Sequence, residues 1–136
     1  MSVITVNALV NATIENVWDS WINPKHVVNW NFASDDWHSP EASNHFQLGG
    51  KFVYTMAAKD GSFSFDFSGK FTEITMHKTI SYLLDDGRKV DITFEMFEGQ
   101  VMVIESFEAE TENTEELQQM GWQAILNNFK KYTESI

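Results

Sequence analysis

The sequence predicts an α+β fold in which a bent antiparallel sheet wraps around one long C-terminal helix. Residues 113–136 place their apolar side chains on one broad arc at a spacing of about 100° per residue, as a helix packed against a larger surface does. Several earlier runs alternate apolar and polar residues with a period of two, which is typical of strands with one buried face. Strands and helices are also segregated along the chain, which excludes a doubly wound parallel sheet.

The C-terminal segment is the only long helical pattern in the sequence. Its apolar arc comprises Leu117, Met120, Trp122, Ala124, Ile125, Phe129 and Tyr132. Gly121 lies inside this pattern, although glycine costs about 1 kcal/mol relative to alanine in the middle of a helix. The glycine therefore indicates either a close approach of the helix to its neighbours or a pocket wall that needs space beside Trp122.

One strand and two short helices are expected at the N-terminus. Residues 2–10 are rich in β-branched side chains and alternate in polarity, which predicts a strand. Thr13 can cap a helix that stops near Asn23, because Pro24 disfavours a helical conformation in the residue before it. Pro24 also suits the first turn of a second helix, which we expect to end at about Trp30.

Residues 31–48 show no stable period, are rich in Asn, Ser, Asp and His, and contain Pro40. We expect a long loop anchored by Phe32, Trp37 and Phe46. Loops of this length are uncommon in compact domains unless they serve a function, such as covering a pocket. This segment is therefore the best candidate for a lid.

A meander of antiparallel strands is expected in the second half. The strands cover residues 51–57, 62–71, 79–84, 90–97 and 101–108, with tight turns around Gly61, Gly87 and Gly99. The second of them carries Phe63, Phe65, Phe67 and Phe71 on one face, which predicts a deep apolar interior. Gly69 lies in the same row and marks either a bulge or a bend of the sheet around the helix. In the fourth strand, Val90, Ile92, Phe94 and Met96 are expected to face inward.

Glu105 lies in the last predicted strand. If Val101, Val103 and Phe107 point inward, Glu105 points inward too, and burial would favour its neutral form. A carboxyl group in such a place suits a general acid or base, or a polar anchor for a ligand. The opposite frame also buries apolar side chains and leaves Glu105 in solvent, so the pattern leaves this choice open.

Composition limits the classes of function. A net charge of −11, from 20 acidic and 9 basic residues, disfavours DNA, RNA and anionic membrane surfaces as partners. The absence of Cys excludes disulfides and thiolate chemistry and fits a cytoplasmic location. No window approaches the ~18 apolar residues of a membrane span. We therefore expect a soluble chain that forms one domain, residues 1–136.

The polar residues show no familiar catalytic or metal-binding pattern. The four histidines lack the paired spacings that metal sites favour, and no nucleophile elbow is present. Gly49-Gly50 is not followed by the helix that a phosphate cradle needs. We expect no metal and no cofactor, and favour a non-enzymatic role while leaving catalysis open. The acidic residues around Glu108–Glu116 suit a solvated loop before a helix, or a patch for a basic partner.

Short motifs follow one another in a fixed order over essentially the whole chain. They are Val17-Trp18 with Trp21 and Asn23-Pro24, Leu48-Gly49-Gly50-Lys51-Phe52, Asp60-Gly61, Gly69-Lys70-Phe71-Thr72-Glu73-Ile74, and Gly121-Trp122 with Leu126, Phe129 and Tyr132. Together they resemble bacterial homologues of the activator of heat-shock protein 90 ATPase, a family of the START-like (SRPBCC) superfamily. The resemblance implies the helix-grip fold, with a cavity between the bent sheet and the last helix. It also implies a chaperone partner and a place in the stress response, while superfamily relatives bind lipids, hormones or polyketides and some catalyse cyclisation.

The leading hypothesis is that the chain, as a monomer or a homodimer, binds an apolar or aromatic small molecule between the sheet and the last helix. The expected lining residues are Trp30, Trp37, Phe46, Phe52, Tyr54, Phe65, Phe67, Phe94, Trp122, Ile125 and Phe129, with Glu105 as a polar anchor. One alternative is a chaperone-interacting module that uses the acidic residues of Glu108–Glu116. The other is a cyclase-like or hydrolase-like enzyme that uses Glu105.

Overall fold

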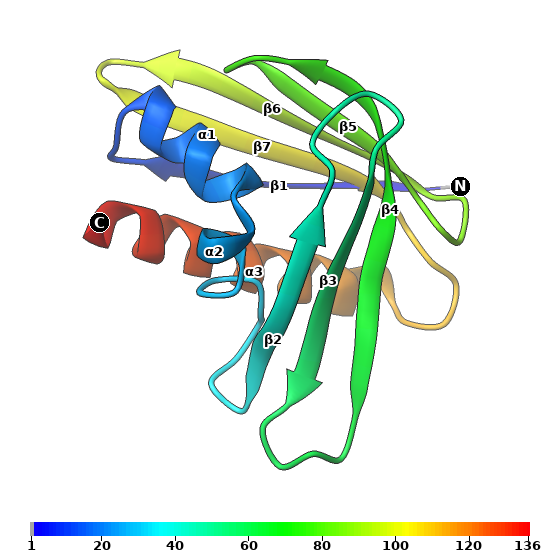
Figure 1. Cartoon of the computed structure of the whole chain (residues 1–136). Coiled ribbons are helices and arrows are strands. Elements are labelled where there is room, and N and C mark those ends of the chain that lie inside the picture. The colour runs from blue at the N-terminus through cyan, green and yellow to red at the C-terminus, as the bar shows by residue number, and fades with distance from the viewer. Residues whose placement is uncertain (1) are drawn as a thin grey trace.

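A computed structural model describes residues 2–136 of the chain. The elements are β1 (Val3–Val10), α1 (Ile14–Ile22), α2 (Pro24–Val27), β2 (Trp37–Asn44), β3 (Lys51–Ala58), β4 (Ser64–Thr75), β5 (Thr79–Leu84), β6 (Lys89–Phe97), β7 (Gln100–Glu108) and α3 (Glu115–Ser135). Within these residues, seven antiparallel strands form one sheet in the order β1-β7-β6-β5-β4-β3-β2. Figure 1 shows this sheet curving around α3, with β2 and β3 passing in front of the helix. The predicted α+β helix-grip architecture is confirmed.

The predicted helix starts are confirmed by side-chain caps. Thr13 Oγ1 accepts a hydrogen bond from the Asn16 amide at 3.2 Å, and Thr114 Oγ1 accepts one from the Leu117 amide at 3.1 Å. Each cap satisfies one of the backbone donors that a helix leaves free at its N-terminus. The second short helix is Pro24–Val27 and is therefore shorter than expected.

The prediction of a long loop over residues 31–48 is wrong in its central part. Residues Trp37–Asn44 form β2, which pairs with β3 at the edge of the sheet. The register shifts between His38 and Glu41, so Pro40 lies at an irregularity of an edge strand, where a missing amide donor is tolerated. Polar composition and this proline hid the strand in the sequence.

The phenylalanine row of β4 does not lie wholly in the interior. Phe71 is 4% exposed, whereas Phe65 and Phe63 are 43% and 59% exposed. In Figure 1 the β3–β4 turn extends past α3, so the outer part of this strand face is not covered by the helix. Met96, which was expected to face inward, is exposed for a similar reason, because it lies at the end of β6 beside the β6–β7 turn.

Gly69 marks a close approach of two strands. A Cβ atom at this position would clash with the Leu83 carbonyl oxygen of β5. The irregularity in the pairing of β4 with β5 lies farther along, between Phe71 and Glu73. The glycine thus lets β4 approach β5 where the sheet bends, and the bulge itself is elsewhere.

The buried face of α3 is shifted from the predicted arc. Leu126 and Phe129 are fully buried, but Leu117 and Met120 at the start of the arc are exposed. The Phe129 ring lies 4.9 Å from the ring centroids of both Trp21 and Trp30. This aromatic cluster joins α3 to α1 and to the segment that follows α2.

The substitution Phe129→Ala is expected to reduce the free energy of unfolding by about 3–5 kcal/mol, because it leaves a cavity among buried rings. Phe63→Ala, which removes the same side chain from an exposed position, should change it by less than about 0.5 kcal/mol. Urea titration of both variants measures the difference. Equal effects of the two substitutions would contradict this description of the core.

Candidate functional site

A cavity of about 350 Å³ lies between the sheet, α3 and the segment that follows α2. Its lining residues are Trp21, Ile22, Trp30, Asn31, Phe32, Ala33, Ser34, Trp37, Phe52, Tyr54, Met56, Phe65, Phe67, Phe71, Tyr82, Arg88, Glu105, Gly121, Trp122 and Ile125. Eleven of these twenty residues carry Trp, Tyr or Phe rings, which come from α1, the segment after α2, strands β2 to β5, and α3. The cavity is therefore apolar and largely aromatic, as small-molecule sites usually are.

The structure brings most of the sequence-predicted site residues together at this cavity. Trp30, Trp37, Phe52, Tyr54, Phe65, Phe67, Glu105, Trp122 and Ile125 line it. The other three lie in the core, which corrects their predicted placement. Phe46 packs on Trp18 and Phe71, and Phe94 packs on Trp18 and Trp21. Phe129 lies in the aromatic cluster described above.

Sequence reasoning missed several lining residues. Tyr82 alternates with the apolar Ile80 and Leu84 on one face of β5, and this pattern is a signal for an inward position. Asn31, Phe32, Ala33 and Ser34 belong to the segment predicted as a lid, and this short part of it does line the cavity. Trp21, Ile22, Met56, Phe71 and Arg88 carried no signal that separates a lining position from an ordinary core or turn position.

Hydrogen bonds fix the segment that follows α2. The Trp30 indole Nε1 donates to the Ser20 carbonyl oxygen at 2.9 Å. Asn128 of α3 donates through Nδ2 to the Phe32 carbonyl oxygen at 3.1 Å. The segment is thus held to α1 on one side and to α3 on the other, which positions the wall that it contributes.

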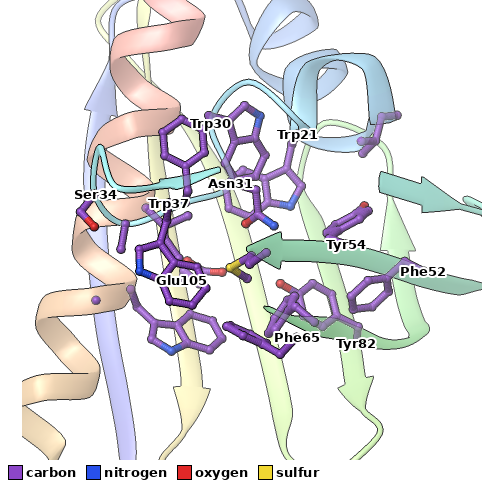
Figure 2. Close-up of a pocket in the computed structure, with 18 of the residues that line it drawn as sticks. Trp21, Trp30, Asn31, Ser34, Trp37, Phe52, Tyr54, Phe65, Tyr82 and Glu105 are labelled. Carbon is purple, nitrogen blue, oxygen red and sulfur yellow. The ribbon is translucent and has the colours of Figure 1, made fainter. Parts of the chain in front are cut away.

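Glu105 points inward, so the structure decides between the two frames of β7. Its register partners are Val6 of β1 and Ile92 of β6, both buried, and Glu105 itself is 5% exposed. Figure 2 shows its side chain directed into the space between Trp37, Tyr54, Phe65 and Tyr82. Burial raises the pKa of Glu105 to about 8, and no neighbouring charge or hydrogen bond within residues 2–136 lowers it.

The other polar groups at the wall have distinct surroundings. The Tyr54 hydroxyl accepts a hydrogen bond from Asn44 Nδ2 at 2.9 Å, and burial raises the pKa of Tyr54 to about 12. Burial and the Glu105 carboxyl raise the pKa of Tyr82 well above its usual value. Arg88 donates to Asp86 Oδ2 at 2.8 Å and to the Glu108 carbonyl oxygen at 3.4 Å. The cation at the wall is therefore already paired.

Gly121 faces open space. A Cβ atom at this position would meet nothing within 4 Å, which rules out a close approach of the helix as the reason for the glycine. The neighbouring Trp122 ring stacks on Phe107 with centroids 3.8 Å apart and planes 10° apart. Gly121 therefore leaves room at the cavity wall beside a fixed indole, which is the second of the two readings of this glycine.

No group of three or more His, Asp or Glu side chains in residues 2–136 is arranged to hold a metal ion. No helix in that range is long and apolar enough to cross a membrane.

The fold and the cavity define a START-like, helix-grip protein. The chain belongs to the family described as Activator of Hsp90 ATPase homolog 1-like protein, whose model matches residues 11–134. No curated protein matches the sequence.

Solved structures agree with this assignment. The AHSA1-like protein of Aeromonas hydrophila is 44% identical, with 98% of this chain and 93% of that one covered and a TM-score of 0.92. A protein of Cytophaga hutchinsonii is 50% identical, with 97% and 92% covered and a TM-score of 0.84. The Aha1 protein of Colwellia psychrerythraea, solved as a dimer, shares the fold at 16% identity, with 98% and 97% covered and a TM-score of 0.78.

Glu105→Gln is expected to change how stability depends on pH. The carboxyl has a pKa of 4.5 when unfolded and about 8 when folded, so the native state loses stability as pH rises between these values. Relative to the parent protein, the variant should gain about 3–5 kcal/mol between pH 4 and pH 9. Urea unfolding at several pH values measures this gain. The exposed Glu112→Gln is the control, and parallel pH profiles for all three proteins would contradict the assignment.

Gly121→Ala is expected to stabilise the protein by about 1 kcal/mol, because the new methyl group meets no atom and alanine favours the helix. Gly99→Ala is the matched control. Gly99 also has open space around it, but its φ of +81° is strained for any residue with a Cβ atom. That variant should lose about 1–2 kcal/mol. Thermal unfolding distinguishes the two signs, and a destabilised Gly121→Ala would show that the space is filled.

Proposed function

We propose that the protein binds an apolar or aromatic small molecule in the cavity between the sheet and α3. The observation that supports this most is the cavity of about 350 Å³, walled by aromatic rings and containing the unpartnered Glu105 carboxyl. Sites of this kind combine an apolar lining, which provides affinity, with a few polar groups, which orient the ligand. Glu105 would be such a group, and the cytoplasm would be the compartment in which the protein meets its ligand.

Catalysis is the second candidate function. An enzyme of this kind requires the Glu105 carboxyl inside the cavity, and the Glu105 side chain is buried and lines that cavity. General acid or base catalysis by a buried carboxyl with a raised pKa is chemically sound. The wall offers little to act with it, however. Ser34 is the only lining residue with an aliphatic hydroxyl, and that hydroxyl donates to Asp36 Oδ1 at 2.5 Å, a carboxylate that does not line the cavity. The enzyme would be favoured if the parent protein converts a bound compound and Glu105→Gln abolishes this turnover while still binding the compound.

A chaperone-interacting module is the third candidate, and the description of the family supports it. The acidic residues proposed for this contact are partly used within the chain. Glu108 accepts from the Lys89 amide at 2.7 Å, and Glu110 accepts from the Asn113 amide at 2.7 Å. Exposed carboxylates remain at Glu112, Glu115 and Glu116. Salt-sensitive binding to a purified chaperone would support this role in the stress response, and a lack of such binding would contradict the role.

Binding can be measured with N-phenyl-1-naphthylamine, a neutral dye whose emission rises in apolar surroundings. The parent protein should bind it, with energy transfer from the tryptophans at the wall. Gly121→Leu places a side chain into the open space at the wall and should weaken binding at least about tenfold, equivalent to about 1.4 kcal/mol. Because leucine favours a helix, this variant should also remain folded.

Met120→Leu provides the matched control, because Met120 is exposed on the same helix one residue away. It should bind the dye as the parent protein does. Failure of the parent protein to bind, or unchanged binding by Gly121→Leu, would overturn the proposed function.

A further inference from the structure

Among the residues that the structure describes, 2–136, Glu105 carries the only carboxyl group at the cavity wall, and no basic side chain of that range pairs with it. The only basic side chain at the wall, Arg88, is occupied by Asp86 and by the Glu108 carbonyl oxygen. Burial is the cause of the raised pKa of Glu105, and no opposing contribution from Arg88 accompanies it. Any partner for an ionised Glu105 must therefore come from a guest.

The surroundings of Glu105 favour a cationic guest over an anionic one. Aromatic rings attract organic cations through the negative potential of their faces, and rings dominate this wall. The chain carries a net charge of −11, which raises the local concentration of cations and repels anions. A carboxylate guest would meet an acidic protein and a carboxyl group, with no free basic side chain at the wall.

From this arrangement we propose that the cavity takes an organic amine, with its ammonium group against Glu105 and its apolar body among the aromatic rings. This inference rests on the ligand-binding function proposed above and specifies the class of ligand. The volume equals that of about a dozen water molecules at ~30 Å³ each, which suits a guest of modest size.

Binding of an ammonium ion would be coupled to loss of a proton from Glu105. The neutral carboxyl releases its proton to solvent, and the carboxylate that forms pairs with the ammonium, so charge and atoms balance. Affinity should therefore rise with pH up to the pKa of about 8. Since about 1% of Glu105 is ionised at pH 6 and about 90% at pH 9, the amine should bind about 10-fold to 100-fold more tightly at pH 9.

Within residues 2–136, no other group that faces Glu105 titrates between pH 6 and pH 9. From β3 and β5 the titratable groups are Tyr54 and Tyr82, whose pKa values are both raised. Arg88 precedes β6 and stays charged. The register partners on β1 and β6 are aliphatic, and α3 contributes only Gly121, Trp122 and Ile125 to the wall. The pH dependence would thus report on Glu105.

Titration calorimetry with three compounds of one carbon skeleton tests the proposal. They are 4-phenylbutylamine, 4-phenylbutan-1-ol and 4-phenylbutanoate, which are cationic, neutral and anionic. The expected order of affinity at pH 9 is amine, alcohol, carboxylate. Repeating the amine titration in buffers of different ionisation enthalpy should show release of about one proton per amine bound at pH 6 and close to none at pH 9.

Variants assign the effect to Glu105. Glu105→Gln should lose both the preference for the amine and its pH dependence, while keeping the affinity for the alcohol within about threefold. Glu112→Gln makes the same chemical substitution at an exposed position and should bind as the parent protein does.

Three results would overturn the inference. If the alcohol binds more tightly than the amine at every pH, the inference of an amine ligand is wrong. The proposed function would remain intact in that case, provided that the neutral dye still binds. An amine preference that persists in Glu105→Gln would assign it to the overall charge instead. Failure of all three compounds to bind would exclude the amine, and the dye experiment would then decide separately whether the cavity binds any guest.

Discussion

The cavity depends on aromatic contacts that attach α3 to the rest of the molecule at two separate places. Near its C-terminal end, Phe129 packs against Trp21 and Trp30, and nearer its start Trp122 stacks on Phe107. These two attachments are seven residues apart, or about 10 Å along the helix axis at 1.5 Å per residue. A helix cannot bend inward over so short a distance without losing backbone hydrogen bonds, so the space between the attachments stays open.

Glu105 lowers the stability of the folded protein, because it places a carboxyl group in the buried, apolar wall of the cavity. An apolar residue at the same place in β7 would remove the cost of a buried carboxyl without loss of sheet pairing. Some neighbouring polar groups are satisfied, since the Tyr54 hydroxyl is bonded to Asn44 and the Trp30 indole to Ser20. Asn31 Nδ2, which is also buried at the wall, has no hydrogen-bond partner within residues 2–136. Two polar groups that line the cavity, on Glu105 and Asn31, are therefore buried without partners from the described chain. Conflicts of this kind between local composition and stability concentrate at functional sites.

Local patterns in the sequence were enough to predict most of the fold. The strands β3, β5 and β6 alternate clearly, and glycine-containing turns mark the β3–β4, β5–β6 and β6–β7 connections. The caps at Thr13 and Asn23 define helix starts by chemistry within three residues. The edge strand β2 could not be predicted, because an edge tolerates the polar residues and the proline that normally indicate a loop. Its ladder with β3 is a contact between segments, and sequence periodicity does not report such contacts.

The orientation of Glu105 could not be predicted for a related reason. Both faces of β7 carry apolar side chains, so alternation alone does not distinguish them. What decides the frame is the pairing with Val6 of β1, almost a hundred residues earlier in the chain, and with Ile92 of β6. The site therefore depends on long-range register, whereas the aromatic residues around it were recognisable from composition and strand pattern.

The phenylalanine row of β4 connects the core, the cavity and the surface along one strand face. Phe71 is buried, Phe67 is half-buried at the cavity wall, and Phe65 and Phe63 are progressively more exposed. Trp37 of β2 contacts both of the outer rings, with centroids 6.0 and 6.1 Å away. β3 and β4 extend past α3 (Figure 1), and Phe65 links the two regions because it lines the cavity and also packs on Phe63 and Trp37. The exposed phenylalanines are thus continuous with the lining of the cavity, which accounts for apolar side chains that the core does not need.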